Sequence, residues 1–253
     1  MELYDALSKG TVCIALLASA FAAPTMAQSA APIGDTETAS AVAVIVKVPK
    51  PWYAPKWLIV RRMRDTIPRY EALPGLAYKA FSLTQADGQF GGIYLWKDSA
   101  SAKAWFTKAW FERVEKERGA KPDVHSFEVP VAIDNTPGGT PADNDSDTVA
   151  TLVTMTKSAG LDRLGLVADF TASIPTDKAV PGLLRKYFII ADDGKFGGIY
   201  LWKDEVSAQH WLNDGWKQRL HTRYGSEATI EWFETPILLP TKVGTNRVAI
   251  TGL

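Results

Sequence analysis

Hydrophobic positions along this chain change their period in the same order twice. In residues 41–48 every second residue is a valine, at positions 42, 44, 46 and 48, which is the period of a β-strand. From residue 56 the spacing becomes helical, with an apolar face formed by Trp57, Val60, Met63 and Ile67. Pro68 and Pro74-Gly75 interrupt this spacing. The pattern therefore predicts a strand followed by a helix.

A hairpin and a last strand are predicted next. Residues 78–83 and 91–97 have strand character, and Asp87-Gly88 between them is a hairpin turn signal. Residues 124–133 form the last predicted strand of this half. Together with the helix described below, the order is β-α-β-β-α-β.

The helix between the hairpin and the last strand has a clear start signal. Asp98 and Ser99 can cap it, and it is predicted to continue to about Arg118. Its inward-facing positions are predicted to be Ala102, Phe106, Ala109 and Val114.

The second half of the chain gives the same order independently. Asp193-Gly194 takes the place of the first turn signal. The predicted strands cover residues 149–155, 184–190, 197–203 and 229–239, and the predicted helices residues 161–171 and 205–223.

One nine-residue segment occurs twice, letter for letter. Residues 90–98 and 196–204 both read Phe-Gly-Gly-Ile-Tyr-Leu-Trp-Lys-Asp. Flanking residues also agree, at a spacing of 107 before this segment and 106 after it. The chain is therefore a tandem duplication of one small domain.

The β-α-β-β-α-β unit predicts an α+β fold of the ferredoxin-like type. Four antiparallel strands carry both helices on one face, so the other face of the sheet needs a cover. The second copy can provide that cover. We therefore expect the two domains to pack sheet to sheet within one chain, giving a monomer that acts as an internal pseudo-dimer.

Composition shifts divide the chain into six predicted segments. A Gly/Pro-rich polar stretch separates the repeats. The segments are a signal peptide (1–27), a flexible N-terminal segment (28–40), repeat 1 (41–134), a linker (135–147), repeat 2 (148–240) and a C-terminal tail (241–253), in which residues 247–251 could add a short strand.

The first segment has the features of a cleavable export signal. Residues 11–23 are an apolar run, Pro24 ends it, and small residues allow cleavage after Ala27. This predicts export, to the periplasm, with an uncleaved anchor as the alternative. Cleavage would remove Cys13, the only cysteine, so disulfides and thiolate chemistry are not expected.

Charge and motifs exclude several classes of function. The 253 residues include 28 basic and 28 acidic side chains, with no basic stripe, so nucleic acid is not an expected partner. No Gly-rich phosphate loop opens a helix, which argues against a nucleotide site. His125, His210 and His221 are scattered and form no cluster with metal-ligand spacing, so no metal site is predicted. A pocket without cofactor, for a small molecule, is what remains.

The repeated motifs resemble a known family. The pattern Pro-Gly-x-x-x-Lys-x-Phe, then Gly-Gly-Ile-Tyr-Leu-Trp-x-Asp, then Phe-Glu-x-Pro is similar to the YdhR-like mono-oxygenase family. The resemblance covers both repeats. It implies the fold of the superfamily that includes the antibiotic-biosynthesis mono-oxygenases, here as an intrachain dimeric α/β-barrel. Members are usually single domains that dimerise, whereas this chain is a fused pair.

The resemblance also implies a place for a ligand, between the helices and the sheet. Aromatic residues are the candidate lining, although each tryptophan could equally belong to the core, where burial removes about 150–250 Å² from water. Ala109 and Gly215 are expected to leave room beside them. The substrate-binding candidates are Trp96, Trp105, Ala109, Trp110, Trp202, Trp211, Gly215, Trp216, Lys79 and Lys186.

The catalytic candidates are His210, Tyr200 and Tyr94. Both tyrosines recur in the repeated strand and can donate hydrogen bonds. His210 replaces Ala104 beside a repeated tryptophan and can act as a base near neutral pH. Because repeat 2 also has the smaller Gly215, we expect its pocket to be the working one.

Two pairs of charged residues recur as well. Lys79 and Lys186 lie in the second strand of each repeat, and Glu128 and Glu234 in the last strand. These strands are at opposite edges of one ferredoxin-like sheet, so we expect the lysine of one repeat to pair with the glutamate of the other.

Three functions remain open on the sequence. The first is a cofactor-independent mono-oxygenase acting on a small hydrophobic or phenolic molecule, in which the protein supplies a dry aromatic pocket, a base and hydrogen-bond donors. The second is an exported, non-catalytic binding protein. The third is another reaction of the superfamily: isomerisation, cyclisation or haem breakdown.

Overall fold

The computed structural model describes residues 40–51, 53–136, 147–156 and 160–239, which belong to one compact unit. The predicted signal peptide with Cys13, nearly all of the flexible segment, most of the linker and the C-terminal tail lie outside the described residues. None of the helices in the described part of the chain is long and apolar enough to cross a membrane.

Each repeat has the predicted order of strands, and its helices are more divided than predicted. The elements of the first repeat are β1 (Ala41–Val48), α1 (Lys56–Asp65), α2 (Ile67–Glu71), β2 (Leu76–Thr84), β3 (Phe90–Trp96), α3 (Ser99–Trp105), α4 (Lys108–Arg118) and β4 (Asp123–Asp134). Those of the second repeat are β5 (Val149–Thr156), α5 (Arg163–Lys178), β6 (Leu183–Ile190), β7 (Lys195–Trp202), α6 (Glu205–Trp211), α7 (Asp214–Tyr224) and β8 (Thr229–Leu238).

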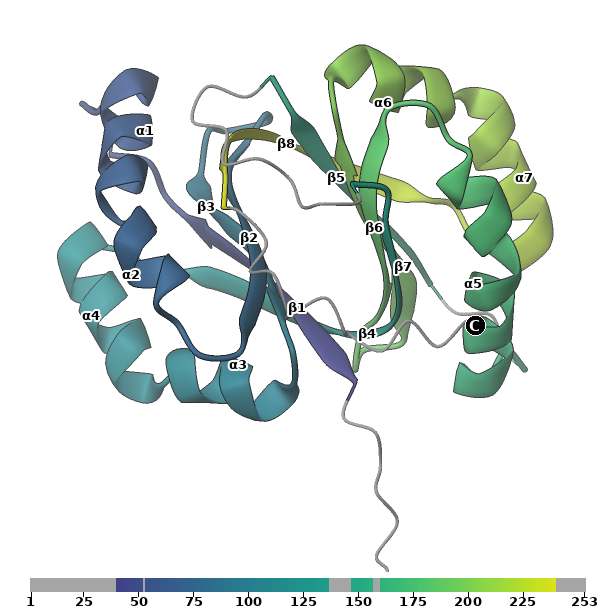
Figure 1. Ribbon diagram of the computed structural model, residues 1–253, viewed down its shortest axis with the longest axis horizontal. Helices are drawn as coiled ribbons and strands as arrows, with labels where there is room; N and C mark the ends of the chain where they lie inside the picture. Colours follow the sequence, from purple (N-terminus) through teal and green to yellow (C-terminus); the bar gives the residue numbers. More distant parts are fainter. Residues whose placement is uncertain (1–39, 52, 137–146, 157–159, 240–253) are drawn as a thin grey trace, which may run out of the picture. The chain divides into compact units, whose positions relative to one another are not determined.

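The eight strands form one closed antiparallel barrel, in the order β1-β3-β2-β8-β5-β7-β6-β4. Each repeat supplies a four-stranded sheet, and the edge strands of the two sheets pair with each other. β2 pairs with β8 and β4 pairs with β6, so the edges of both sheets are closed by the other repeat. The fold is the expected α+β barrel of two ferredoxin-like halves, and Figure 1 shows the helices of the two halves on opposite sides of the barrel.

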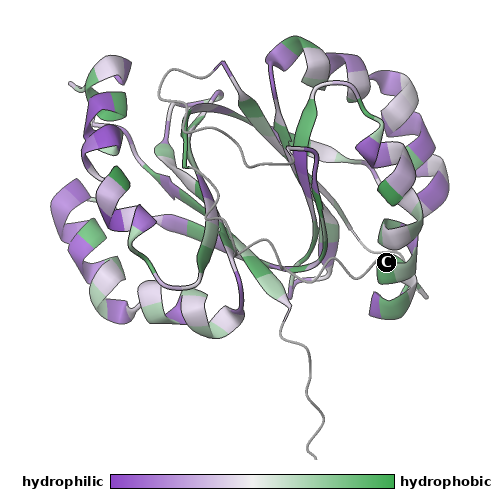
Figure 2. Cartoon of the chain, in the orientation of Figure 1, coloured by the Kyte–Doolittle hydropathy of each residue, from purple (hydrophilic) through white to green (hydrophobic). Residues whose placement is uncertain are grey.

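Both faces of the barrel wall are buried. Alternate residues of the strands face inward and form a core drawn from both repeats, including Ile45, Ile93, Tyr187 and Phe233. The other residues face outward and pack under the helices. Hydrophilic and hydrophobic residues alternate along the helices (Figure 2), as expected for helices that bury one face.

The expected pairing of Lys79 with Glu234 and of Lys186 with Glu128 is wrong. Glu234 instead pairs with Lys56, at the start of α1. Glu128 accepts a 3.1 Å hydrogen bond from Nε of Arg163, at the start of α5. Each glutamate still pairs with a residue of the other repeat, but that residue is an exposed one at the start of a helix. Lys79 and Lys186 are not available as partners, because both point out of the barrel and under the helices of their own repeat.

The helix after the repeated segment is broken, which changes which residues face the sheet. Asp98 caps α3 as predicted, accepting a 2.7 Å hydrogen bond from the Ser101 N–H. The chain leaves the helical conformation at Phe106, and Thr107 caps a new helix by accepting from the Trp110 N–H. The restart shifts the phase, so Trp110 is buried and Ala109 is exposed, contrary to the expectation for Ala109.

The first helix has the predicted inner face in part, since Val60 and Met63 are buried as expected. Its buried residues are Ile59, Val60 and Met63, whereas Trp57 is 65% exposed. In the second repeat, α5 continues to Lys178 and includes Pro175, so it is longer than the sequence predicted.

The repeated double glycine has a separate structural reason at each position. A Cβ on Gly91 or Gly197 would collide with the carbonyl oxygen of the neighbouring strand, at Val46 or Val153. A Cβ on Gly92 would lie 3.1 Å from a ring carbon of Tyr94, so this glycine makes room for the tyrosine ring. Both glycines therefore shape the strand that presents Tyr94 and its counterpart.

We expect one chain to be the complete assembly in solution. Each repeat closes both sheet edges of the other, so the barrel needs no second chain to pair its strands. Size-exclusion chromatography with light scattering is expected to give the mass of one chain. A stable dimer over a wide concentration range would contradict this.

Candidate functional site

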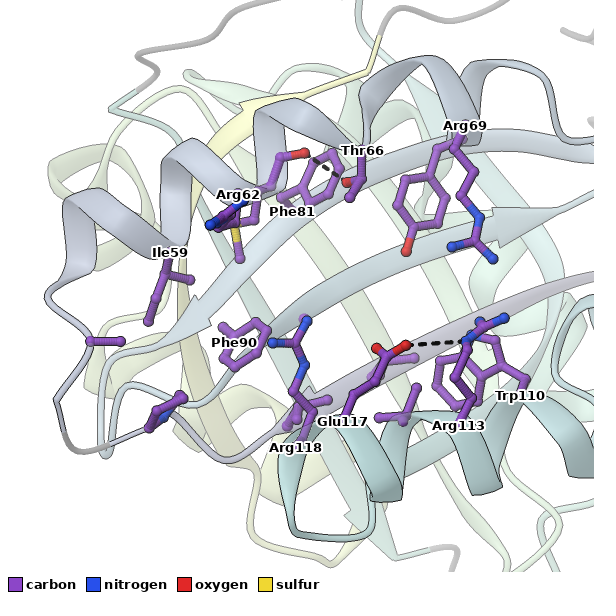
Figure 3. A pocket seen from close by; sticks show the side chains of 18 of the residues that line it. Ile59, Arg62, Thr66, Arg69, Phe81, Phe90, Trp110, Arg113, Glu117 and Arg118 are labelled. Carbon is purple, nitrogen blue, oxygen red and sulfur yellow. Dashed lines mark hydrogen bonds and ion pairs between the residues drawn. The ribbon is translucent and has the colours of Figure 1, made fainter. Parts of the chain in front are cut away.

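A cavity of about 430 Å³ lies between the outer face of the first repeat's sheet and its helices. Residues of α1 and α2 form one wall, residues of α4 form the opposite wall, and residues of β1, β2 and β3 form the floor. Figure 3 shows this space between the helices, with side chains entering it from both sides. Its aromatic lining residues are Tyr53, Tyr70, Phe81, Phe90, Tyr94, Trp105 and Trp110.

Lys79 lies on the floor of this cavity and is 1% exposed. Its neighbours Tyr78 and Ala80 face the barrel interior, so the alternation of β2 turns Lys79 toward the helices. Lys79 Nζ donates a 2.9 Å hydrogen bond to the Tyr94 hydroxyl. It also lies 3.0 Å from the ring centre of Tyr70 and 3.9 Å from that of Phe81. No ion pair joins Lys79 to a carboxylate in the described chain.

Burial therefore lowers the pKa of Lys79 well below its ordinary value, and the charge of Arg69 lowers it further. The surrounding rings oppose this effect, because a cation over an aromatic face gains about 2 kcal/mol in a desolvated site. Burying an unpaired ion costs several kcal/mol, which is the larger quantity. Burial also raises the pKa of Tyr94 well above its ordinary value. Burial thus favours the uncharged forms of both hydrogen-bonded groups, the amine of Lys79 and the phenol of Tyr94.

The second repeat has an equivalent cavity of about 370 Å³ with a different charge arrangement. Lys186 corresponds to Lys79, but its Nζ forms a 2.8 Å ion pair with Asp177. Asp177 also accepts a 2.8 Å hydrogen bond from Ser173. Burial lowers the pKa of Lys186, and Asp177 opposes that shift by stabilising the ammonium form. At the spacing of 107 residues Asp177 takes the place of Tyr70, so one substitution separates a paired lysine from an unpaired one.

Eight of the residues selected from the sequence line a cavity, four in each repeat. Those that line the two cavities are Tyr94, Trp105, Trp110, Lys79, Tyr200, Trp211, Trp216 and Lys186. Trp96 and Trp202 do not line a cavity, and they are 1% and 0% exposed. Each stacks on the tyrosine of the same strand, with ring centres 6.3 Å and 5.6 Å apart. At about 25 cal/mol per Å² their burial is worth roughly 4–6 kcal/mol each, which is a sufficient structural reason for them.

The structure places His210, Ala109 and Gly215 outside both cavities. All three are exposed, so the expectation that they shape a pocket is wrong. For Gly215 the break before α7 is the cause, since Asn213 caps a new helix there and Trp216 becomes the inward residue. The second cavity is also the smaller one, contrary to the expectation of extra room in repeat 2.

The other titratable groups of the described chain do not form a metal site. No group of three or more His, Cys, Asp or Glu residues lies close enough to hold an ion in the described ranges. His125 and His221 are exposed beside Asp123 and Glu227.

The sequence analysis did not select Tyr70 and Asp177, which decide whether the buried lysine has a carboxylate partner. Aligning the first helices of the two repeats at a spacing of 107 would have found this difference.

Comparison with solved structures identifies proteins of the same architecture. A "putative monooxygenase" from Fusobacterium nucleatum matches with a TM-score of 0.60 at 13% identity, over 81% of this chain and 96% of the other. A "putative monooxygenase" from Lactobacillus acidophilus matches with a TM-score of 0.53 at 12% identity, over 80% and 100%. The chain shares its fold with these proteins.

A third similar structure is that of an anthrone oxidase-like protein. It matches with a TM-score of 0.52 at 9% identity, over 82% of this chain and 95% of that one. No protein-family model matches the sequence, and no curated protein is significantly similar to it. At these identities the comparisons establish the barrel fold, shared with distant monooxygenase-like proteins.

Proposed function

We propose that the first-repeat cavity is the active site of a cofactor-independent mono-oxygenase for a small aromatic hydroxy compound. The observation that carries this proposal is the place of Lys79, which is buried without a carboxylate partner and faces an aromatic cavity of about 430 Å³, where burial holds its pKa well below the ordinary value. A general base must be unprotonated to accept a proton, and a lowered pKa favours that form of an amine. The repeated motifs that resemble the YdhR-like family support the same class of reaction, and we propose membership of that family.

In the proposed reaction Lys79 Nζ removes a proton from a phenol or from the activated CH₂ of its ketone form. The resulting anion is electron-rich enough to react with dioxygen directly. One oxygen atom forms a bond to the carbon, the O–O bond breaks, and the second oxygen leaves as water with the two hydrogens of the CH₂. The carbon loses four electrons and dioxygen accepts four, so no other reductant is needed. An anthrone, whose CH₂ becomes a carbonyl, is a suitable test compound.

The surroundings of Lys79 suit this role. Tyr94 stays protonated because of its burial, and it accepts the N–H of the amine, which leaves the nitrogen lone pair for the substrate. The rings around the cavity exclude water and can stack on a planar substrate. Haem breakdown is less well supported, because none of the three histidines lines either cavity.

The test is dioxygen uptake with 1,8-dihydroxyanthrone, measured against the rate without protein. We expect one O₂ consumed per ketone formed, at a rate well above the background. Tyr94→Phe removes the hydrogen bond that orients the amine and is expected to lower turnover by about tenfold. Tyr200→Phe is the matched change in the second cavity and is expected to have little effect.

Equal losses from the two tyrosine variants would mean that both cavities work. Binding of hydroxylated aromatics with no uptake of O₂ above background would contradict the oxygenase and leave a binding protein, which is the second function that the sequence left open.

A further inference from the structure

The two cavities differ in the charge of their walls as well as in the state of their lysine. Five basic residues and one carboxylate line the first cavity. Three basic residues and two carboxylates line the second, where Asp177 pairs with Lys186, and Asp169 with Arg223 at 2.6 Å. The first cavity therefore has an excess of positive charge that the protein itself does not neutralise.

Two arginines of the first cavity, Arg69 and Arg118, account for much of this excess. Neither forms an ion pair with a carboxylate in the described chain. The guanidinium of Arg69 lies 4.8 Å from the ring centre of Trp105, and that of Arg118 lies 5.3 Å from that of Phe90. Contact with a ring orients each guanidinium and leaves its N–H donors free for a ligand.

The arginines approach the cavity from both of its helical walls. In Figure 3 Arg69 extends into the space from α2 and Arg113 from α4, at the end near Trp110. Arg62 and Arg118 extend from α1 and α4 at the end near Phe90. Arg113 and Arg62 each have a carboxylate nearby, Glu117 at 4.0 Å and Asp65 at 3.9 Å, but these are exposed contacts and weak.

The second repeat supplies a comparison within the same molecule. Thr176 stands at the position of Arg69, and Tyr224 at that of Arg118. Asp169 stands at the position of Arg62. The two cavities are built from equivalent strands and equivalent tryptophans. We therefore relate these replacements to the ligand more than to the stability of the site.

We propose that the first cavity binds an aromatic carboxylate, with Arg69 and Arg113 at the Trp110 end binding the carboxylate and the aromatic floor receiving the ring. A planar guanidinium fits a planar carboxylate with two parallel hydrogen bonds, and a partly enclosed site strengthens them. With the proposed function, on which this substrate class rests, the ligand would be a hydroxyaromatic acid whose hydroxyl reaches Lys79. The arginine groups would then select the substrate, and Lys79 would act on it.

The experiment compares two ligands that differ by one carboxylate. Binding of 3-hydroxy-2-naphthoate and of 2-naphthol, which is uncharged at pH 7, is measured by titration calorimetry. We expect the acid to bind at least about tenfold more tightly, and this advantage to shrink in high salt. Arg69→Thr and Arg118→Tyr introduce the residues that the second repeat already has. Arg69→Thr is expected to weaken binding of the acid by about tenfold, whereas Arg118→Tyr, at the other end of the cavity, is expected to weaken it by less than about threefold. Both variants are expected to change binding of 2-naphthol by less than about twofold.

Arg61→Thr is the matched control, because Arg61 is an exposed residue of α1 that does not line the cavity. It removes the same charge from the protein and should leave both affinities within about twofold. Equal affinities for the two ligands, or equal losses from Arg61→Thr and Arg69→Thr, would overturn the proposal. Circular dichroism of each variant verifies that a loss of binding is not a loss of fold.

The same data separate this proposal from the proposed reaction. Tight, arginine-dependent binding of the acid without any O₂ uptake would leave the anion site in place and reject the oxygenase. Oxidation of hydroxyaromatics with no preference for the acid would do the reverse.

Discussion

Lys79→Met is expected to stabilise the protein, whereas Lys186→Met is expected to destabilise it, although the two lysines occupy equivalent positions. Lys79 is buried without a carboxylate partner, so methionine removes a desolvated polar group and fills the same space. A gain of about 1–3 kcal/mol in the free energy of unfolding is expected at neutral pH. Lys186→Met leaves the buried carboxylate of Asp177 without its ion pair, which typically costs about 3–5 kcal/mol.

The effect of Lys79 depends on pH with a definite sign. Its folded pKa is lowered from the ordinary value of 10.5, so between these two values the unfolded chain binds a proton that the folded chain does not. The free energy of unfolding of the wild type therefore falls as the pH falls through this interval. The advantage of Lys79→Met is largest at low pH and shrinks as the pH rises toward 10.5.

Urea unfolding of the wild type and both variants, at several pH values, measures these differences. Lys97→Met, on an exposed lysine in the same repeat, is the control and should change stability little. If Lys79→Met lowered stability by as much as Lys186→Met does, Lys79 would be a charged and paired residue, and the neutral amine on which the proposed reaction depends would be excluded.

Tyr70→Asp is expected to abolish turnover while leaving the fold intact. This variant gives the first cavity the residue that the second already has, next to Lys79 Nζ. At the equivalent position the carboxylate of Asp177 lies 2.8 Å from Lys186 Nζ. A carboxylate at this distance favours the ammonium form, which cannot accept a proton. Loss of a general base typically lowers the rate by about 10²–10⁴-fold.

Initial rates of O₂ uptake with 1,8-dihydroxyanthrone measure this effect, and Tyr70→Phe is the control that removes the hydroxyl without adding a charge. Tyr70→Phe should retain most of the activity, since the ring that contacts Lys79 remains. The charge argument would fail if Tyr70→Phe and Tyr70→Asp lost activity equally, because the loss would then belong to the tyrosine hydroxyl.

The two repeats thus share a fold and differ at the positions where chemistry is decided. The residues that build the wall, such as Trp96 and Trp202, are the same in both. The residues that set the charge beside the lysine, Tyr70 and Asp177, are not. This difference supports the proposal that the first cavity holds the ligand, since in the second the lysine is engaged in an ion pair.

The sequence by itself determined the duplication, the order of the strands and the barrel. The period of the apolar residues separates strands from helices, and the repeated turn signals place the hairpins, because both depend on near neighbours in the chain. It also determined the cap at Asp98 and the place of Tyr94 in the cavity floor, since the alternation of the repeated strand fixes which side chains point outward.

Only the tertiary structure decided which charges meet. The restart of the helix at Thr107 turned Ala109 outward, and the analogous break in the second repeat did the same for Gly215. The pairing of β2 with β8 left Lys79 under its own helices, out of reach of Glu234. Whether a buried lysine is paired depends on the side chain that an adjacent helix places beside it, and that choice lies at contacts distant in sequence, which local periodicity does not report.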